Sequence, residues 1–167
     1  MIPYRMNPLG SGWPKEGSYG VFLTSSGTAV SSAIVTSGAI VSGTDYEQAV
    51  YSHGTARETV VSSGGIQIVS SGGVTTSSIL DGGRQIVSSG ASASYTVINN
   101  GGLMLVSSGG ISISAAVSSG GTATVYSGAA DSQTTIWGTM YVGGTANSNI
   151  AGSGGHLLTR THTNTGT

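Results

Sequence analysis

Short apolar runs recur along the chain at nearly constant spacing, and each run is followed by a turn rich in serine and glycine. Gly-Gly pairs precede one series of runs, with spacings of 18, 19 and 19 residues. The first glycines of these pairs are Gly64, Gly82, Gly101 and Gly120. A second series of turns follows eight residues later, at Gly72, Gly90, Gly109 and Gly128. A period that persists in this way is typical of solenoids, and it predicts two strands and two turns per repeat.

The apolar positions keep the same place in every repeat. When the runs IQIV, RQIV, LMLV, TATV and TMYV are stacked, the last column holds only valine: Val69, Val87, Val106, Val125 and Val142. Strand side chains alternate between faces, so the column two residues earlier should share the same side. That column holds Gln67, Gln85, Met104, Ala123 and Met140. Its glutamines either stack as a buried hydrogen-bonded ladder or the facing is mixed.

The second series of runs also supplies one apolar position per repeat. These runs end in the pairs Val60-Val61, Ile79-Leu80, Val97-Ile98, Ala116-Val117 and Thr135-Ile136. A disordered Gly/Ser linker has no reason to keep β-branched residues in register, whereas stacked repeats bury them jointly. We therefore predict an all-β fold, a stacked β-solenoid with about 18–19 residues per coil, in preference to a disordered chain or a silk-like aggregate. A thin Val, Ile and Ala core and an outer carpet of Ser and Thr hydroxyls are expected.

The two ends of the chain differ from the repeats. We predict an N-terminal tail and candidate cap over residues 1–24, solenoid repeats over residues 25–158, and a frayed C-terminal tail over residues 159–167. A cap is expected because solenoids expose unpaired strand edges at their ends. Residues 38–52 break the period, which predicts an insertion loop or an irregular coil there.

Composition narrows the classes of function. Charged residues make up 7% of the chain, against roughly 25% in an average soluble domain. The five basic residues are scattered and the formal net charge is −1, so nucleic acid is not an expected partner. The chain has no cysteine, which excludes disulfides and thiolate metal sites. Its beginning lacks the apolar segment of a signal peptide, so an exported protein would be represented here by an excised piece.

Catalytic chemistry finds little support among the titratable residues. The six acids are mostly isolated; Asp45 and Glu47 would share one face of a strand, but a solvated loop is the favoured interpretation. His53 stands where other repeats have a turn glycine, which indicates a surface residue. The Gly- and Asp-rich calcium-binding repeat is missing. We predict no enzyme activity, no metal site and no cofactor.

Serine pairs lie at strand ends just before the turns, where their hydroxyls satisfy turn backbone groups. Regularly spaced exposed hydroxyls are also acceptors for O-linked sugar or partners for another such rod. The candidate acceptors are Ser62, Ser63, Ser70, Ser71, Ser88, Ser89, Ser107, Ser108, Ser118 and Ser119. The few charges that would set the register between two rods are Arg57, Glu58, Arg84 and Asp131.

The stretches "SHGTARETVVSSGGIQIVSSGG", "VTTSSILDGGRQIVSSG" and "SSGGTATVYSG" carry a resemblance to a known family. They resemble the repeats of passenger domains of AIDA-type self-associating autotransporter adhesins from Gram-negative bacteria, over about residues 25–155. The resemblance implies a right-handed parallel β-helix at the cell surface, exported through a C-terminal outer-membrane translocator barrel that this sequence lacks. It also implies autoaggregation, biofilm formation and attachment to a host-cell receptor, and heptose added to serines and threonines by a dedicated glycosyltransferase.

Three functions follow as hypotheses. The first is an adhesin fragment that associates with itself through its polar surface, with many weak contacts adding up by avidity. The second is an acceptor substrate of a protein O-heptosyltransferase. The third, more remote, is an ice-binding solenoid, suggested by VTT, TAT and TTI, although these threonines change column from coil to coil.

Overall fold

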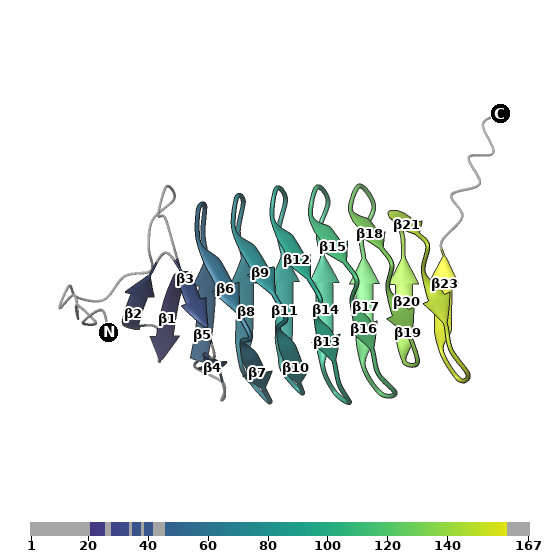
Figure 1. Cartoon of the computed structure of the whole chain (residues 1–167), viewed down its shortest axis with the longest axis horizontal. Coiled ribbons are helices and arrows are strands. Elements are labelled where there is room, and N and C mark those ends of the chain that lie inside the picture. The colour runs from purple at the N-terminus through teal and green to yellow at the C-terminus, as the bar shows by residue number, and fades with distance from the viewer. Residues whose placement is uncertain (1–20, 26–27, 34, 38, 42–45, 160–167) are drawn as a thin grey trace.

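The computed structural model describes residues 21–25, 28–33, 35–37, 39–41 and 46–159, with side chains from residue 39 onward. Within these residues it contains strands and no helix, and the strands stack into an elongated rod (Figure 1). The rod is a β-solenoid, or β-helix, which confirms the predicted fold class. Most of the expected N-terminal cap and nearly all of the expected C-terminal tail lie outside the described residues.

Each coil contributes one strand to each of three sheets. The nine-stranded sheet contains, in spatial order, β2 (Thr28–Ala33), β1 (Val21–Ser25), β5 (Tyr46–Val50), β8 (Ile66–Val69), β11 (Arg84–Val87), β14 (Leu103–Val106), β17 (Thr122–Val125), β20 (Thr139–Val142) and β23 (His156–Thr159). The β4–β22 sheet contains β4 (Ile40–Val41), β7 (Val60–Ser62), β10 (Ile79–Asp81), β13 (Val97–Ile98), β16 (Ala116–Val117), β19 (Thr135–Ile136) and β22 (Ile150–Ala151). The β3–β21 sheet contains β3 (Val35–Ser37), β6 (Thr55–Arg57), β9 (Val74–Thr76), β12 (Ser92–Ser94), β15 (Ile111–Ile113), β18 (Ala130–Ser132) and β21 (Thr145–Asn147).

The register of the nine-stranded sheet confirms the valine column. From β5 to β20 the strands are parallel, and the last residue of each strand pairs with the last residue of the next. These residues are Val50, Val69, Val87, Val106, Val125 and Val142, all buried. In the β4–β22 sheet the second apolar residue of each pair is buried in the same way, from Val41 to Ile136. The core is therefore a stack of nearly identical layers.

The structure corrects the predicted number of strands per coil from two to three. A third corner joins the β3–β21 sheet to the β4–β22 sheet without any glycine in its left-handed position. Its residues with positive φ are Glu58, Ser77, Tyr95, Ser114, Gln133 and Ser148. The amides of the first five are bonded from coil to coil; the Ser77 amide, for example, donates to the Ser94 carbonyl at 2.9 Å. Stacking thus offsets a conformation that costs a non-glycine residue energy.

The glutamine column is a buried hydrogen-bonded ladder. Gln48, Gln67 and Gln85 are fully buried and pair in register on β5, β8 and β11. The amide nitrogen of Gln85 donates to Oε1 of Gln67 at 2.6 Å, and that of Gln67 donates to Oε1 of Gln48. Each Oε1 also accepts a hydroxyl from the third corner: Thr59, Ser78 and Thr96. Of the two arrangements left open by the sequence, the ladder is the observed one.

At one end of the rod, β1 and β2 replace the parallel stacking by an antiparallel pair. β1 lies antiparallel to both β2 and β5, so it occupies the edge that the first parallel strand of this sheet would otherwise expose. The boundary expected at residue 24 falls inside β1. For residues 38–52 an insertion loop or an irregular coil was expected, and the described part fits a coil: residues 40–41 and 46–50 are strands β4 and β5, and Val41 and Val50 fill the same core columns as Val61 and Val69.

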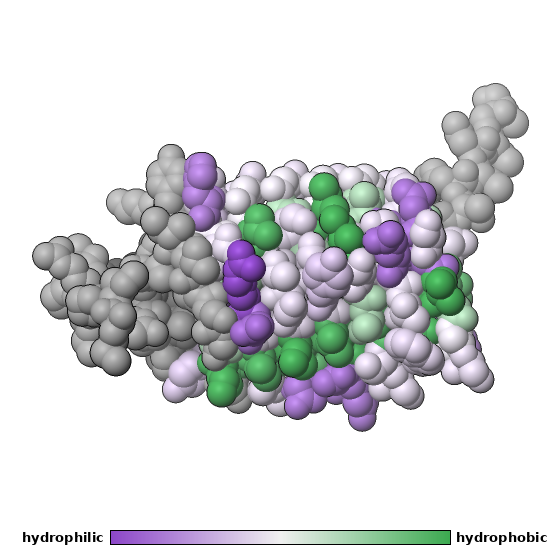
Figure 2. Space-filling model, in the orientation of Figure 1, coloured by the Kyte–Doolittle hydropathy of each residue, from purple (hydrophilic) through white to green (hydrophobic). Residues whose placement is uncertain are grey.

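The outer surface is less polar than the predicted carpet of hydroxyls. The outward column of the β4–β22 sheet is largely apolar and forms a row along the rod, visible as green atoms in Figure 2. We call it the apolar row: Ile40, Val60, Ile79, Val97, Ala116, Thr135 and Ile150. Ile40 is 72% exposed and Ile150 66% exposed. The short strands place an apolar residue on each face, so burying one exposes the other.

Candidate functional site

The candidate site is the corner that joins the nine-stranded sheet to the β3–β21 sheet, and we call it the serine corner. It is formed by residues 51–54, 70–73, 88–91, 107–110 and 126–129. In the second of these turns the Gly73 amide donates to the Ser70 carbonyl at 2.8 Å, and Gly72 has a φ of 75°. This is the geometry of a type II turn, whose third residue needs a positive φ and is therefore usually glycine.

The second residue of every one of these turns is a serine. The column consists of Ser52, Ser71, Ser89, Ser108 and Ser127; Ser52 is half-buried and the other four are exposed. The first four hydroxyls each lie against the left-handed glycine of the next coil: a Cβ added at Gly90 would stand 2.7 Å from Oγ of Ser71. Because stacked strands are about 4.8 Å apart, the hydroxyls form a ladder at that spacing along one edge of the rod.

The serine corner is held as firmly as the strands. The amide of Gly72 donates to the carbonyl of Gly90, and the same bond joins Gly90 to Gly109 and Gly109 to Gly128, at 2.8–2.9 Å. The hydroxyls at the apex therefore stand on a hydrogen-bonded backbone, and their spacing is fixed by the sheet.

The ten predicted serines fall into two corners. Three pairs, Ser70-Ser71, Ser88-Ser89 and Ser107-Ser108, belong to the serine corner, and in each pair the first residue is half-buried and the second exposed. The pairs Ser62-Ser63 and Ser118-Ser119 lie in the corner that joins the β4–β22 sheet to the nine-stranded sheet, with the same exposure pattern. There the column of second serines is interrupted, because the intervening coils have Gly82 and Asn100 at that position.

Sequence reasoning missed two members of the ladder, Ser52 and Ser127. Both follow a tyrosine, in YSHG and YSGA, so they do not belong to a Ser-Ser pair. The signal that would have found them is the position one residue before the turn glycine, or before His53, which has a φ of 61° and takes the place of that glycine. His53 is exposed, as expected for a surface turn.

The four charges proposed to set the register between rods do not form one cluster. Arg57 is exposed on β6 in the β3–β21 sheet, Glu58 is exposed in the third corner, and Arg84 is exposed on β11 in the nine-stranded sheet. Asp131, expected at the surface, is buried in the core and is therefore not available to a neighbouring rod. Its carboxylate accepts the Asn149 amide at 2.7 Å and the Thr134 hydroxyl at 3.0 Å.

Two carboxyls are affected by burial. Burial raises the pKa of Asp131, while the hydrogen bonds that it accepts oppose the shift. Burial raises the pKa of Glu47 from 4.5 to about 7. Glu47 lies within β5, in register with Ile66, so its place is a partly buried strand and not the solvated loop expected from the sequence.

The described residues bear on three other expectations. No group of three His, Asp or Glu side chains among them is arranged to hold a metal ion, and none of their segments is a candidate membrane-spanning helix. The threonines of VTT, TAT and TTI are divided among the sheets: Thr75 is buried, Thr124 faces outward on β17, and Thr135 faces outward on β19. The threonines of these three motifs thus do not form one array.

Comparisons with known proteins give a likeness among solved structures. No family model matches the sequence, and no curated protein matches it. Among solved structures, the chain is similar to the crystal structure of a TibA fragment hyper-glycosylated by TibC. The identity is 25%, the match covers 77% of this chain and 76% of that one, and the TM-score is 0.30.

Proposed function

We propose that the chain is a solenoid segment of a bacterial cell-surface adhesin that associates with further copies of itself and attaches cells to a host surface, acting by surface contact and not by catalysis. The observation that carries this proposal is the unbroken ladder of hydroxyls at the serine corner. Its rungs repeat at the coil spacing, about 4.8 Å. A second rod of the same construction has the same spacing, so contacts made at one coil are repeated at the next.

Each such contact is weak, and the strength comes from repetition. A hydroxyl–hydroxyl bond exchanges water for protein and contributes about 1 kcal/mol or less. Several rungs in register, multiplied over many molecules on two cell surfaces, give avidity without a tight pairwise affinity. The resemblance of the repeats to AIDA-type passenger domains supports the same proposal.

The apolar row offers additional contact area. Isolated apolar residues on a surface are common, whereas apolar residues that gather in a row, here with Ile40, Ile79 and Ile150 exposed, are typical of interaction surfaces. The row lies on the β4–β22 sheet, the one sheet that does not border the serine corner. It would therefore serve a second contact, separate from the hydroxyl ladder.

Sedimentation velocity over a wide concentration range tests self-association. We expect reversible dimers or larger species for the full chain, and a weaker association for the triple variant Ser71→Ala, Ser89→Ala, Ser108→Ala. The matched control is Ser63→Ala with Ser119→Ala, which removes exposed hydroxyls from the interrupted corner. A monomer at all concentrations, or an equal effect of both sets, would refute this role of the ladder. Arg84→Glu is expected to change association without unfolding, and unchanged association would exclude that site.

The exposure of the second serine in each pair favours a second candidate function, that of an acceptor for O-linked heptose. Ser63, Ser71, Ser89, Ser108 and Ser119 are all exposed at the apex of a turn, where a transferase can reach them. Intact-mass measurement after co-expression with a protein heptosyltransferase tests this function. Increments of one heptose that disappear in the five-serine variant are expected, and an unmodified mass would refute it.

A further inference from the structure

A groove of about 760 Å³ opens on the nine-stranded sheet near β23, beside the last rung of the serine corner. It is lined by Thr124, Val125, Tyr126, Ser127, Tyr141, Val142, Gly143, Leu158 and Thr159. None of these residues is charged. The lining is therefore a neutral mixture of aromatic rings, aliphatic groups and hydroxyls.

The groove exists because one coil is shorter at this corner. Residues 126–129 form a four-residue turn, closed by the Ala129 amide on the Tyr126 carbonyl at 3.0 Å. The next coil passes the same corner with Gly143 and Gly144 alone, and Thr145 already pairs with the Ala129 carbonyl at 2.9 Å. Gly143 takes the place of Tyr126 without a side chain and Ser127 and Gly128 have no counterpart, so the shortened turn leaves a hollow beneath them.

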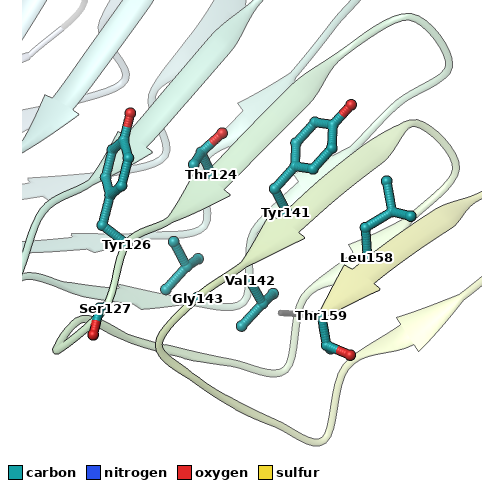
Figure 3. A pocket seen from close by; sticks show the side chains of 9 residues that line it. Thr124, Tyr126, Ser127, Tyr141, Val142, Gly143, Leu158 and Thr159 are labelled. Carbon is teal, nitrogen blue, oxygen red and sulfur yellow. The ribbon is translucent and has the colours of Figure 1, made fainter. Parts of the chain in front are cut away.

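Two tyrosines border this hollow. Thr124, Tyr141 and Leu158 are in register on β17, β20 and β23. Figure 3 shows these three side chains and Tyr126 projecting to the same side of the strands. Tyr126 is 50% exposed and Tyr141 48% exposed, so neither ring fills the core.

Both tyrosines differ from the coils directly before them, and among the serine-corner turns only the first, with Tyr51, also begins with an aromatic residue. The three coils before Tyr126 have serine at its position, ending with Ser107, and the coil before Tyr141 has Thr124. The solenoid therefore forms without an aromatic residue at either position. Two outward rings that folding does not need, placed beside an uncharged hollow, indicate a binding site.

We propose that this groove binds a neutral pyranose sugar. The C–H groups on one face of a pyranose pack against an aromatic ring, while its hydroxyls bond to polar groups at the rim. Tyr126 and Tyr141 supply rings with a polar end, and Thr124, which projects to the same side of the strands in Figure 3, supplies a further hydroxyl. The volume is in the range of small-molecule sites. The absence of charge in the lining favours a neutral sugar over a sulfated or sialylated one.

Tyr141 lies on a paired strand, and the Tyr126 amide donates to the Val106 carbonyl at 2.9 Å. Little entropy is therefore lost on binding, because a tyrosine has few rotatable bonds and its backbone is already fixed. The site needs neither self-association nor modification of the serines, so it stands independently of the proposed function. A sugar attached to another copy has the same chemistry as a free sugar, and the experiment separates these two sources.

The test uses the full chain, produced without a glycosyltransferase and labelled for amide NMR. It is titrated with neutral tetrasaccharides of glucose, galactose, mannose and N-acetylglucosamine, and with a sulfated tetrasaccharide, up to about 10 mM. The variants take the residues that neighbouring coils have: Tyr126→Ser and Tyr141→Thr. The control is Tyr95→Ser. Tyr95 is 59% exposed in the third corner, and the equivalent position in the next coil is a serine.

We expect a neutral tetrasaccharide to shift amides of residues 124–127, 141–143 and 158–159, with a millimolar Kd. The double variant is expected to bind at least about tenfold more weakly than the unchanged chain. The Tyr95→Ser control is expected to bind with the same affinity as the unchanged chain. If the heptosylated chain also shifts these amides, sugar on another copy is a source of the ligand. The proposal is overturned if no neutral sugar shifts these amide signals, if the double variant binds equally well, or if the sulfated sugar binds more tightly. It is also overturned if dilution alone moves the signals, because that result would assign the groove to a second copy of the chain.

Discussion

One core column is polar toward the β1–β2 end of the rod and apolar toward β23. Gln48, Gln67 and Gln85 fill it in three consecutive coils, and Met104, Ala123 and Met140 fill it in the next three. The backbone register is the same throughout, because every member of the column pairs with the next in a parallel ladder. The solenoid therefore does not depend on an apolar residue at this position.

What changes together with the column is the third corner. Thr59, Ser78 and Thr96 stand beside the glutamines and each donates a hydroxyl to one of them. At the next coil, where Met104 replaces glutamine, the corner residue is Ala115. A buried amide is tolerated where its hydrogen bonds are complete, and the polar network ends where both partners change at once.

Breaking the middle rung should have the largest effect. Gln67 donates to Gln48 and accepts from Ser78 and Gln85, so Gln67→Leu removes three buried hydrogen bonds. We expect a loss of about 3 kcal/mol in the free energy of unfolding, measured by urea titration. Met104→Leu, the control in the apolar half, should cost less than about 1.5 kcal/mol. Equal losses would show that the ladder is not what stabilises this half.

Extending the ladder into the apolar half should cost less. In Met104→Gln the new amide can donate to Gln85, but Ala115 offers no hydroxyl to its oxygen. A loss of about 2 kcal/mol is expected from the buried unsatisfied acceptor. Adding Ala115→Thr should recover about 1 kcal/mol, and a double-mutant cycle measures that coupling. No recovery would contradict the pairing of corner and column.

Removing the last hydroxyl of the network is a smaller change. The Thr96 hydroxyl donates to Oε1 of Gln85 at 3.2 Å. Thr96→Val keeps the shape and should lower the unfolding free energy by about 1 kcal/mol. Thr135→Val, at a half-buried outward position, should lie within about 0.5 kcal/mol of the unchanged protein. A larger loss for Thr135→Val would argue against a specific role of Thr96.

The smallest expected effect is on the pH dependence of thermal unfolding. Burial raises the pKa of Glu47 from its ordinary 4.5 to about 7 in the folded chain, so the folded state holds a proton that the unfolded chain releases. The contribution of this group to the free energy of unfolding is fully present below about pH 4.5 and is lost as the pH rises toward 7. Because Glu47 is only half-buried, the fall in Tm is on the order of 2 °C.

Glu47→Gln, at the polar end, should flatten that part of the Tm profile. The raised pKa of Asp131 acts in the same direction at the apolar end, so Asp131→Asn is expected to remove the remaining slope. A Tm that rises between these pH values would contradict both assignments.

Much of the fold was predictable because its signals are local and repeated. The valine column and the turn glycines of the serine corner are both visible in the printed sequence, and both occupy the predicted places. The third corner was not predictable in this way. Residues such as Glu58 and Tyr95 carry no turn signal, and they hold a positive φ only because neighbouring coils bond to their amides.

The candidate site was predictable in part. The pairs containing Ser71, Ser89 and Ser108 were identified, but the ladder that joins them to Ser52 and Ser127 depends on which corner each turn occupies. That assignment requires the number of strands per coil. Tyr141 has no aromatic equivalent in the other coils and Tyr126 has one only in Tyr51, and only the shortened corner at Gly143 and Gly144 places the two tyrosines around one hollow.

The sequence by itself determined the period, the strand type and the residues that turn the chain, because these follow from side-chain alternation and backbone preference over a few residues. Only the tertiary structure decided that the glutamines are buried in a ladder, that Asp131 is inside, and that the serines form a continuous edge. Those outcomes depend on neighbours about 18–19 residues away, since a polar side chain is buried only when the adjacent coil completes its hydrogen bonds.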